Sequence, residues 1–218
     1  MGQAYGLPSP MPTLLILAVL IALLIIVLMQ LFKKSQPAPA ARPDLANLKV
    51  TDARKGDVLS ISGAGDNMTD LDFTVDRFAR FDAGSHNTVW LRGLYHERRV
   101  TLRLDIGDDL DVNLANDPRK LTLEDLGLSE DDLAQMDERQ NTADSFEFDG
   151  KVWLYRRSRE VKAWSGDSAQ PTGFYDWEFQ EQDGKRALEV RKSEGEPFAV
   201  TLYTAVPASD VTVYRGNS

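Results

Sequence analysis

The feature that most constrains this chain is an uninterrupted apolar run at residues 13–32, TLLILAVLIALLIIVLMQLF. Twenty residues in a helix rise about 30 Å, which is the thickness of the hydrocarbon core of a bilayer. A cleaved signal peptide would place a basic segment before a shorter apolar run. Here residues 1–12 contain no Lys or Arg, and Lys33-Lys34 follow the run. The sequence therefore predicts one uncleaved transmembrane helix.

The basic residues around this helix predict its orientation. Lys33, Lys34 and Arg42 all lie on its C-terminal side, so the positive-inside rule places residues 1–12 outside and the rest of the chain in the cytoplasm. Residues 33–43 are basic and rich in proline, which favours an extended spacer. We expect a soluble domain at 44–218, held at the membrane by residues 13–32.

The charge and the lack of cysteine exclude several functions. Three of the 25 basic residues precede Asp44 and none of the 34 acidic residues does, which leaves 22 basic against 34 acidic residues, a net charge of −12. Phosphate backbones repel such a domain, so we expect no nucleic-acid binding. The chain has no cysteine, which excludes disulfides, thiolate zinc sites and a cysteine nucleophile.

Apolar residues alternate with polar ones in several segments, a pattern typical of half-buried β-strands. The clearest are residues 100–106 and 73–81. Further strands are expected at 58–62, 198–206 and 211–214. The pairs Asp149-Gly150 and Asp183-Gly184 favour type I′ turns and predict two hairpins, at 146–155 and 175–191.

An acidic segment lies between these β regions. Thr122 precedes Asp125 by three residues, and Ser129 precedes Asp132 by three, which resembles a helix capping box. We expect a short helix from about residue 122 and a longer one over 130–140. The β regions on either side, 44–120 and 145–215, look loosely alike and could be two similar units. The predicted fold is mainly β, built of antiparallel hairpins or meanders around this helical segment, plus the transmembrane helix.

No motif for metal or cofactor binding is complete. The run Asp109-x-Asp111-x-Asn113 begins like a calcium-binding loop, but Leu114 and Lys120 stand where that loop needs Gly and Glu. The sequence therefore predicts no catalytic residue, cofactor site or metal site of a known type.

Two groups of residues remain as candidate sites. In the segment 175–179, three aromatic residues share one face of a strand, and Asp176 and Glu178 share the other. Packing on one face and solvent on the other is the default interpretation, although two such carboxylates would form the site if the protein were an enzyme. Arg156, Arg157 and Arg159 could dock an acidic partner, against a default of salt bridges within the domain.

The second half of the chain contains Asp149-Gly150, Tyr175-Asp176-Trp177 and Glu189, in this order. With these residues it resembles the bacterial domain-of-unknown-function 4178 family. The resemblance implies a β-rich accessory domain of a bacterium, encoded near membrane-stress components, with no activity to carry over. Together with the predicted anchor, this places the protein in the inner (cytoplasmic) membrane.

We therefore expect a membrane-tethered, non-enzymatic adaptor that binds a protein partner at the cytoplasmic face. The alternative is an enzyme or small-ligand-binding domain of unknown substrate. An adaptor should expose an apolar patch or edge strand. An enzyme or ligand-binding domain should have a pocket, and an enzyme's pocket should hold acids with perturbed pKa values.

Overall fold

The computed structural model describes residues 48–82, 87–165, 170–182 and 184–216. These residues belong to one compact unit, which spans residues 45–218. The predicted transmembrane helix at 13–32 and the linker at 33–43 lie outside the described residues. Within the described ranges, no helix has both the length and the apolar character needed to cross a membrane.

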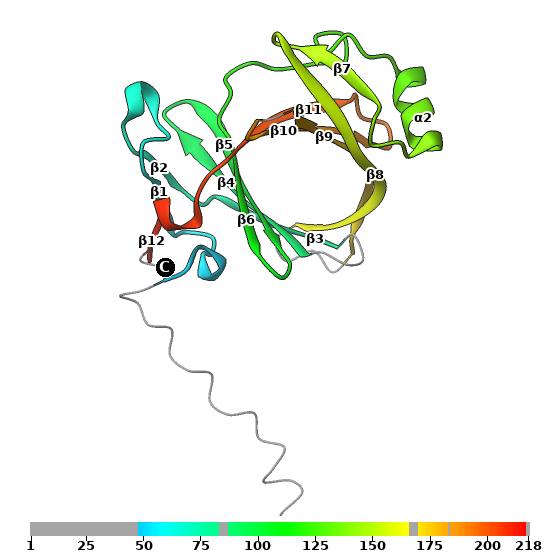
Figure 1. Cartoon of the computed structure of the whole chain (residues 1–218). Coiled ribbons are helices and arrows are strands. Elements are labelled where there is room, and N and C mark those ends of the chain that lie inside the picture. The colour runs from blue at the N-terminus through cyan, green and yellow to red at the C-terminus, as the bar shows by residue number, and fades with distance from the viewer. Residues whose placement is uncertain (1–47, 83–86, 166–169, 183, 217–218) are drawn as a thin grey trace, which may run out of the picture. The chain divides into compact units, whose positions relative to one another are not determined.

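Eight antiparallel strands close into a barrel (Figure 1). In their order around the barrel they are β3 (Arg77–Asp82), β4 (Asn87–Tyr95), β5 (Arg98–Ile106), β6 (Leu110–Ala115), β11 (Ala199–Ala205), β10 (Arg186–Ser193), β9 (Thr172–Glu181) and β8 (Lys151–Ser165). Pairing between β3 and β8, with Phe81 opposite Ala163, completes the ring. A further strand, β7 (Ser145–Phe148), pairs with the start of β8. The prediction of a mainly β, antiparallel fold is confirmed.

The barrel contains two four-stranded meanders, β3–β6 and β8–β11, which lie on either side of the helical segment in the sequence. They meet along β3–β8 and along β6–β11, where Ala205 pairs with Asn113. These meanders fall within the two regions that look alike in the sequence. Their origin by duplication stays a prediction.

A separate three-stranded sheet packs on the outside of the first meander. Its strands are β12 (Val211–Tyr214), β1 (Val58–Ile61) and β2 (Leu71–Thr74), and three 3-10 helices accompany it: η1 (Val50–Asp52), η2 (Asp66–Met68) and η3 (Ala208–Asp210). Leu102 and Leu104 of β5 point toward this sheet and share a core with Leu59 and Ile61. The alternation of β5 thus turns its apolar residues outward and its polar residues into the barrel.

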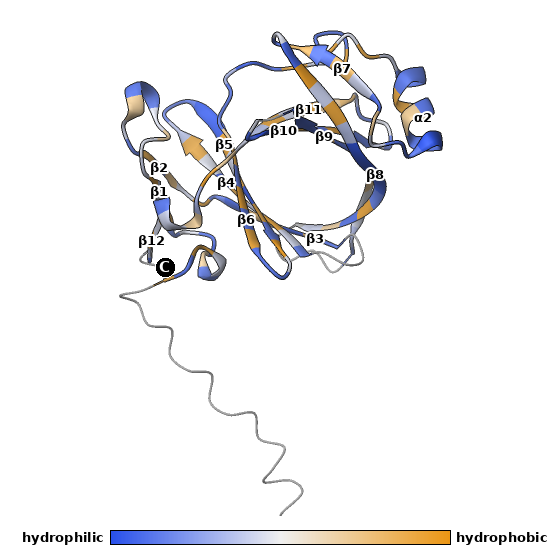
Figure 2. Ribbon diagram, viewed as in Figure 1, coloured by the Kyte–Doolittle hydropathy of each residue, from blue (hydrophilic) through white to orange (hydrophobic). Residues whose placement is uncertain are grey.

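A second outer core lies on the other meander. Helix α2 (Glu130–Arg139) covers the aromatic face of β8 and β9, where Leu133 packs with Trp153, Trp177 and Phe179. The indole N–H of Trp177 donates to the Leu133 carbonyl oxygen at 3.1 Å. Figure 2 shows hydrophobic and hydrophilic residues alternating along the β8 ribbon. On this side too, the apolar face of the sheet is the outer one.

The turns and caps match the predictions in part. Helix α2 begins at the predicted Ser129–Asp132 capping box. Asp149 and Gly150 have φ values of 58° and 66°, as a type I′ turn requires. The second hairpin is also confirmed, since β9 pairs with β10. Its turn includes Asp183, which lies outside the described residues, so the predicted type I′ turn stays a prediction.

Two predicted elements are wrong. Residues 73–81 are split between β2 and β3, which belong to different sheets. The chain turns at Val75 and Asp76, whose N–H groups donate to Asp57 and Arg92. The short helix expected from residue 122 is also absent. Thr122 and Asp125 do form the capping hydrogen bonds, but the chain makes only turns there and then reverses at Gly127, with φ +67°.

Candidate functional site

The interior of the barrel is charged. Residues that pair across neighbouring strands point to the same side, so the inward face can be followed around the ring. The charged residues on it are Arg77, Arg92, Arg103, Asp105, Asp111, Arg157, Arg159, Asp176, Glu178, Glu189 and Arg191. We call this interior the lumen. The two larger apolar cores therefore lie outside the barrel, and charged side chains line much of its interior.

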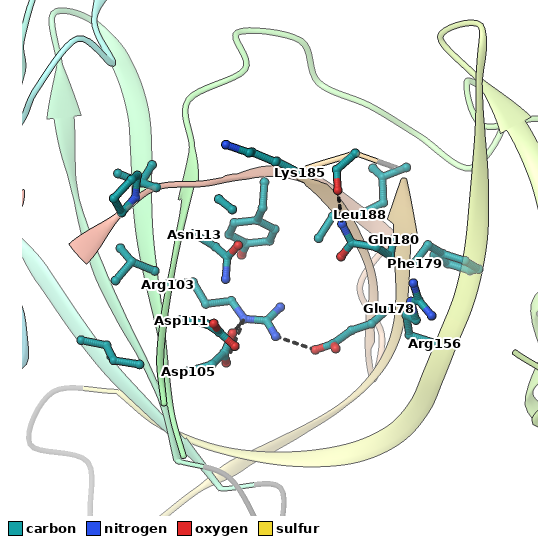
Figure 3. Close-up of a pocket in the computed structure, with 18 of the residues that line it drawn as sticks. Arg103, Asp105, Asp111, Asn113, Arg156, Glu178, Phe179, Gln180, Lys185 and Leu188 are labelled. Carbon is teal, nitrogen blue, oxygen red and sulfur yellow. Dashed lines mark hydrogen bonds and ion pairs between the residues drawn. The ribbon is translucent and has the colours of Figure 1, made fainter. Parts of the chain in front are cut away.

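A network of ion pairs and hydrogen bonds, which we call the lumen network, is centred on Glu178 of β9. Its Oε1 accepts from Arg103 of β5 at 2.7 Å, and its Oε2 accepts from Arg157 of β8 at 2.8 Å. Arg159 donates to the same carboxylate at 3.2 Å. Figure 3 shows Arg103 reaching across the lumen to Glu178. Burial disfavours the charged carboxylate, but the three guanidinium groups outweigh it and hold the pKa of Glu178 below its usual value.

Arg103 is buried and donates hydrogen bonds to two carboxylates. Besides Glu178, it donates from Nε to Asp105 at 2.8 Å, and Asp105 also accepts from Thr88 at 2.7 Å. Its guanidinium carbon lies 5.5 Å from the centre of the Tyr203 ring. The Tyr203 hydroxyl donates in turn to Glu189 at 3.0 Å. These contacts fix side chains of five strands, β4, β5, β9, β10 and β11, in one connected network.

Asp176 titrates differently from its neighbour on β9. It is only 2 % exposed, and its single ion pair, with Arg159, is long at 3.4 Å. Burial raises the pKa of Asp176 to about 7, the charges of Glu178 and Glu189 add to the rise, and Arg159 opposes it. Two carboxyl groups two residues apart therefore have pKa values that are shifted in opposite directions.

One region of the lumen is filled and another is hollow. Phe81, Trp90, Val161 and Phe174 form an aromatic and aliphatic cluster inside the barrel. Strand β9 runs from Phe174, in this cluster, to Gln180, which borders a cavity of about 610 Å³. We call this the lumen cavity.

Polar side chains line much of the lumen cavity (Figure 3). They include Arg103, Asn113, Arg156, Gln180, Lys185 and Tyr203. Among these, Arg156 and Lys185 are exposed, and in the described part of the chain neither side chain has a hydrogen-bond or ion-pair partner. Two free cations therefore border a cavity whose inner wall is already fixed by the lumen network.

The structure divides the arginines that the sequence singled out as one docking group. An irregularity in the β8–β9 pairing falls between Tyr155 and Arg157. Arg157 and Arg159 join the lumen network, whereas Arg156 is exposed beside the cavity. The default interpretation, salt bridges within the domain, holds for Arg157 and Arg159.

Asp176 and Glu178 do share one strand face, as predicted. The expectation that this face is solvated is wrong, because closure of the barrel buries it. Sequence reasoning also missed Gln180, Lys185 and Tyr203 as site residues. The signal that could have shown them is the alternation in the sequence. Each charged inward residue has apolar neighbours on the other face of its strand, and a helix or a second sheet could cover that apolar face.

The raised pKa of Asp176 predicts a pH-dependent stability. Between pH 4 and 7 the folded protein keeps a proton on Asp176 that the unfolded chain has lost, so the free energy of unfolding should fall as pH rises. Asp176→Asn removes this pH dependence. The free energy of unfolding of the wild type minus that of the variant should therefore decrease by up to about 4 kcal/mol from pH 4 to 8. Urea unfolding of both proteins at each pH measures the difference, and a difference independent of pH would refute the assignment.

No protein-family model, curated protein or solved structure matches this chain. The resemblance to the domain-of-unknown-function 4178 family stays a prediction. Function is therefore inferred from the chemistry of the lumen alone.

Proposed function

We propose that this protein binds a small, strongly polar molecule in the lumen cavity, and that residues 13–32 hold it at a membrane while it does so. The observation that carries the proposal is the cavity of about 610 Å³ with fixed and free charged groups on its wall. Cavities that take small molecules in proteins are about 300–1,000 Å³. An eight-stranded barrel is wide enough either to be filled by side chains or to hold one small ligand.

The charged lumen is costly for a purely structural role. Buried ion pairs lose solvation, and well-packed apolar residues can often replace them without loss of stability. The folding energy of this domain can come from its two outer apolar cores. A charged, hydrogen-bonded wall is better explained as a preformed site, because groups already fixed by neighbours lose little entropy when a ligand arrives.

The geometry favours binding over catalysis. The carboxyl group with the strongly raised pKa, Asp176, does not line the lumen cavity; among the described residues it borders a void of about 10 Å³. Glu178 does line the cavity, but three arginines occupy its oxygens. Neither is placed to exchange a proton with a molecule in the cavity.

The adaptor role expected from the sequence stays a prediction. In the described ranges, three large apolar side chains are exposed, namely Met68, Leu94 and Tyr214. None of them borders the lumen cavity. A protein partner could act together with a small ligand, but the cavity is the feature that this structure adds.

Removing the two free cations should weaken ligand binding. The full-length protein in neutral detergent would be dialysed against an aqueous extract of small metabolites, and the retained compounds measured by mass spectrometry. Arg156→Gln combined with Lys185→Gln should reduce retention by about tenfold or more, because hydrogen bonds to charged groups contribute about 1.5–3 kcal/mol.

Two cations near the start of the described chain provide a matched control. Arg54 and Lys55 are adjacent, exposed and absent from the cavity wall. Arg54→Gln combined with Lys55→Gln removes the same charge and should leave retention unchanged. Equal losses in both double variants would show a nonspecific charge effect and contradict the proposed site.

A further inference from the structure

Three arginines gather elsewhere on the inward face of the barrel, away from the lumen cavity. Arg77 of β3 and Arg92 of β4 are register partners, so their side chains lie side by side. The guanidinium carbons of Arg92 and of Arg191, from β10, lie 4.4 Å and 4.7 Å from the centre of the Trp90 ring. None of the three residues lines the lumen cavity. We call Arg77, Arg92 and Arg191 the arginine cluster.

The cluster has no matching set of acids. In the part of the chain that the structure describes, none of its guanidinium groups forms an ion pair or a hydrogen bond with a carboxylate. Glu189 is close enough to influence Arg92, but its carboxylate accepts from the Tyr203 hydroxyl. Every other inward arginine, by contrast, has at least one carboxylate within 3.4 Å.

Arg92 is the member of the cluster with the least favourable electrostatic environment. Burial lowers the pKa of Arg92, and the positive charges of Arg191 and Arg77 lower it further. The Nε of Arg92 is buried and has no hydrogen-bond partner among the described residues, an arrangement that is unfavourable for a buried donor. The chain has nine more acidic than basic residues, so a shortage of acidic residues does not explain why the cluster has no carboxylate partner.

Aromatic rings contact two of the three arginines. A guanidinium group on an aromatic ring uses its flat face for the contact, and its N–H groups lie around the edge of the plane. Trp90 holds Arg92, while Trp90 and Phe174 hold Arg191, whose guanidinium carbon is 5.1 Å from the Phe174 ring centre. Aromatic rings thus fix these two cations without using their donors.

We propose that the arginine cluster binds a multiply charged oxyanion, of which a phosphate group is the best fit. Guanidinium groups donate paired, parallel hydrogen bonds to the oxygens of phosphate. A phosphate monoester carries about −1.5 to −2 charges at pH 7, which suits three cations better than a single carboxylate does. The group could be free phosphate or part of a soluble organic phosphate. This site is independent of the lumen cavity.

The test measures thermal stability of the full-length protein in neutral detergent, followed by intrinsic fluorescence. All four tryptophans lie within residues 90–177, so the signal reports on the barrel. Inorganic phosphate at 10 mM, compared with chloride at equal ionic strength, should raise the Tm by about 5 °C if its Kd is near 0.1 mM. Glycerol phosphate tests a soluble ester, and acetate tests a monovalent anion. A larger shift with glycerol phosphate than with phosphate would identify an organic phosphate as the source, and acetate should give little shift.

Variants assign the effect to the cluster. Arg92→Gln and Arg191→Gln should each abolish most of the phosphate-induced shift, measured against the same variant in chloride, and Arg77→Gln should reduce it. Arg119→Gln is the matched control, because Arg119 is an arginine bound on the surface to Asp117 and Asp149, and it should keep the full shift. No shift in the wild type would overturn the proposal. So would a shift that survives in both variants, or one that is lost instead in the Arg156 and Lys185 double variant.

Discussion

Replacing Glu178 by Gln should destabilise the barrel by about 3–5 kcal/mol, since the change leaves buried charges without their partner. Glu178 binds three arginines, and the side chains of Arg103 and Glu178 are only 9 % and 13 % exposed. The amide keeps the shape of the side chain but carries no charge. Among the described residues, Arg103 is then left with Asp105 alone and Arg157 with no carboxylate. Urea unfolding of the full-length protein in neutral detergent, followed by tryptophan fluorescence, measures the loss.

The exposed ion pair between Arg99 and Asp76 provides the control. Its atoms are 2.6 Å apart, as close as those of the Glu178 pairs, but its side chains are 47 % and 43 % exposed. Water screens such a pair, so Asp76→Asn should cost less than about 1 kcal/mol. If the two variants lost similar amounts of stability, the lumen network would not be the buried, tightly coupled structure described above.

Local sequence patterns predicted the strands well. The alternation at 100–106, the Asp149-Gly150 turn and the cap at Ser129 each depend on residues within a few positions of one another. The same reasoning failed at residues 73–81, where one regular alternation runs through two strands of different sheets. The turn at Val75 depends on acceptors far along the chain, Asp57 and Arg92, which a local pattern cannot reveal.

The site was harder to predict than the fold. Alternation shows that Asp176 and Glu178 share a face, but not whether that face meets water or a closed lumen. Closure depends on the pairing of β3 with β8 and of β6 with β11, which joins segments about 80–90 residues apart. Once the ring is closed, apolar faces must find cover outside, and α2 and the three-stranded sheet supply it. The charged faces then become the interior.

Filling the lumen cavity should abolish ligand binding without changing any charge. Ala187 and Ala205 both border the cavity, on β10 and β11. A phenyl group at either position would occupy the space that a ligand needs, and a cavity of about 610 Å³ has room for it without crowding the wall. Ala143→Phe adds the same group at an exposed position outside the barrel strands and should leave binding unchanged.

Native mass spectrometry of the detergent-solubilised full-length protein, after exposure to the same metabolite extract, tests this account most directly. The wild type and Ala143→Phe should carry bound small molecules of the same masses, and both Ala187→Phe and Ala205→Phe should lose them while their tryptophan fluorescence shows a folded barrel. A wild type that binds nothing, or filled variants that retain the same molecules, would contradict the claim that the lumen cavity is a ligand site.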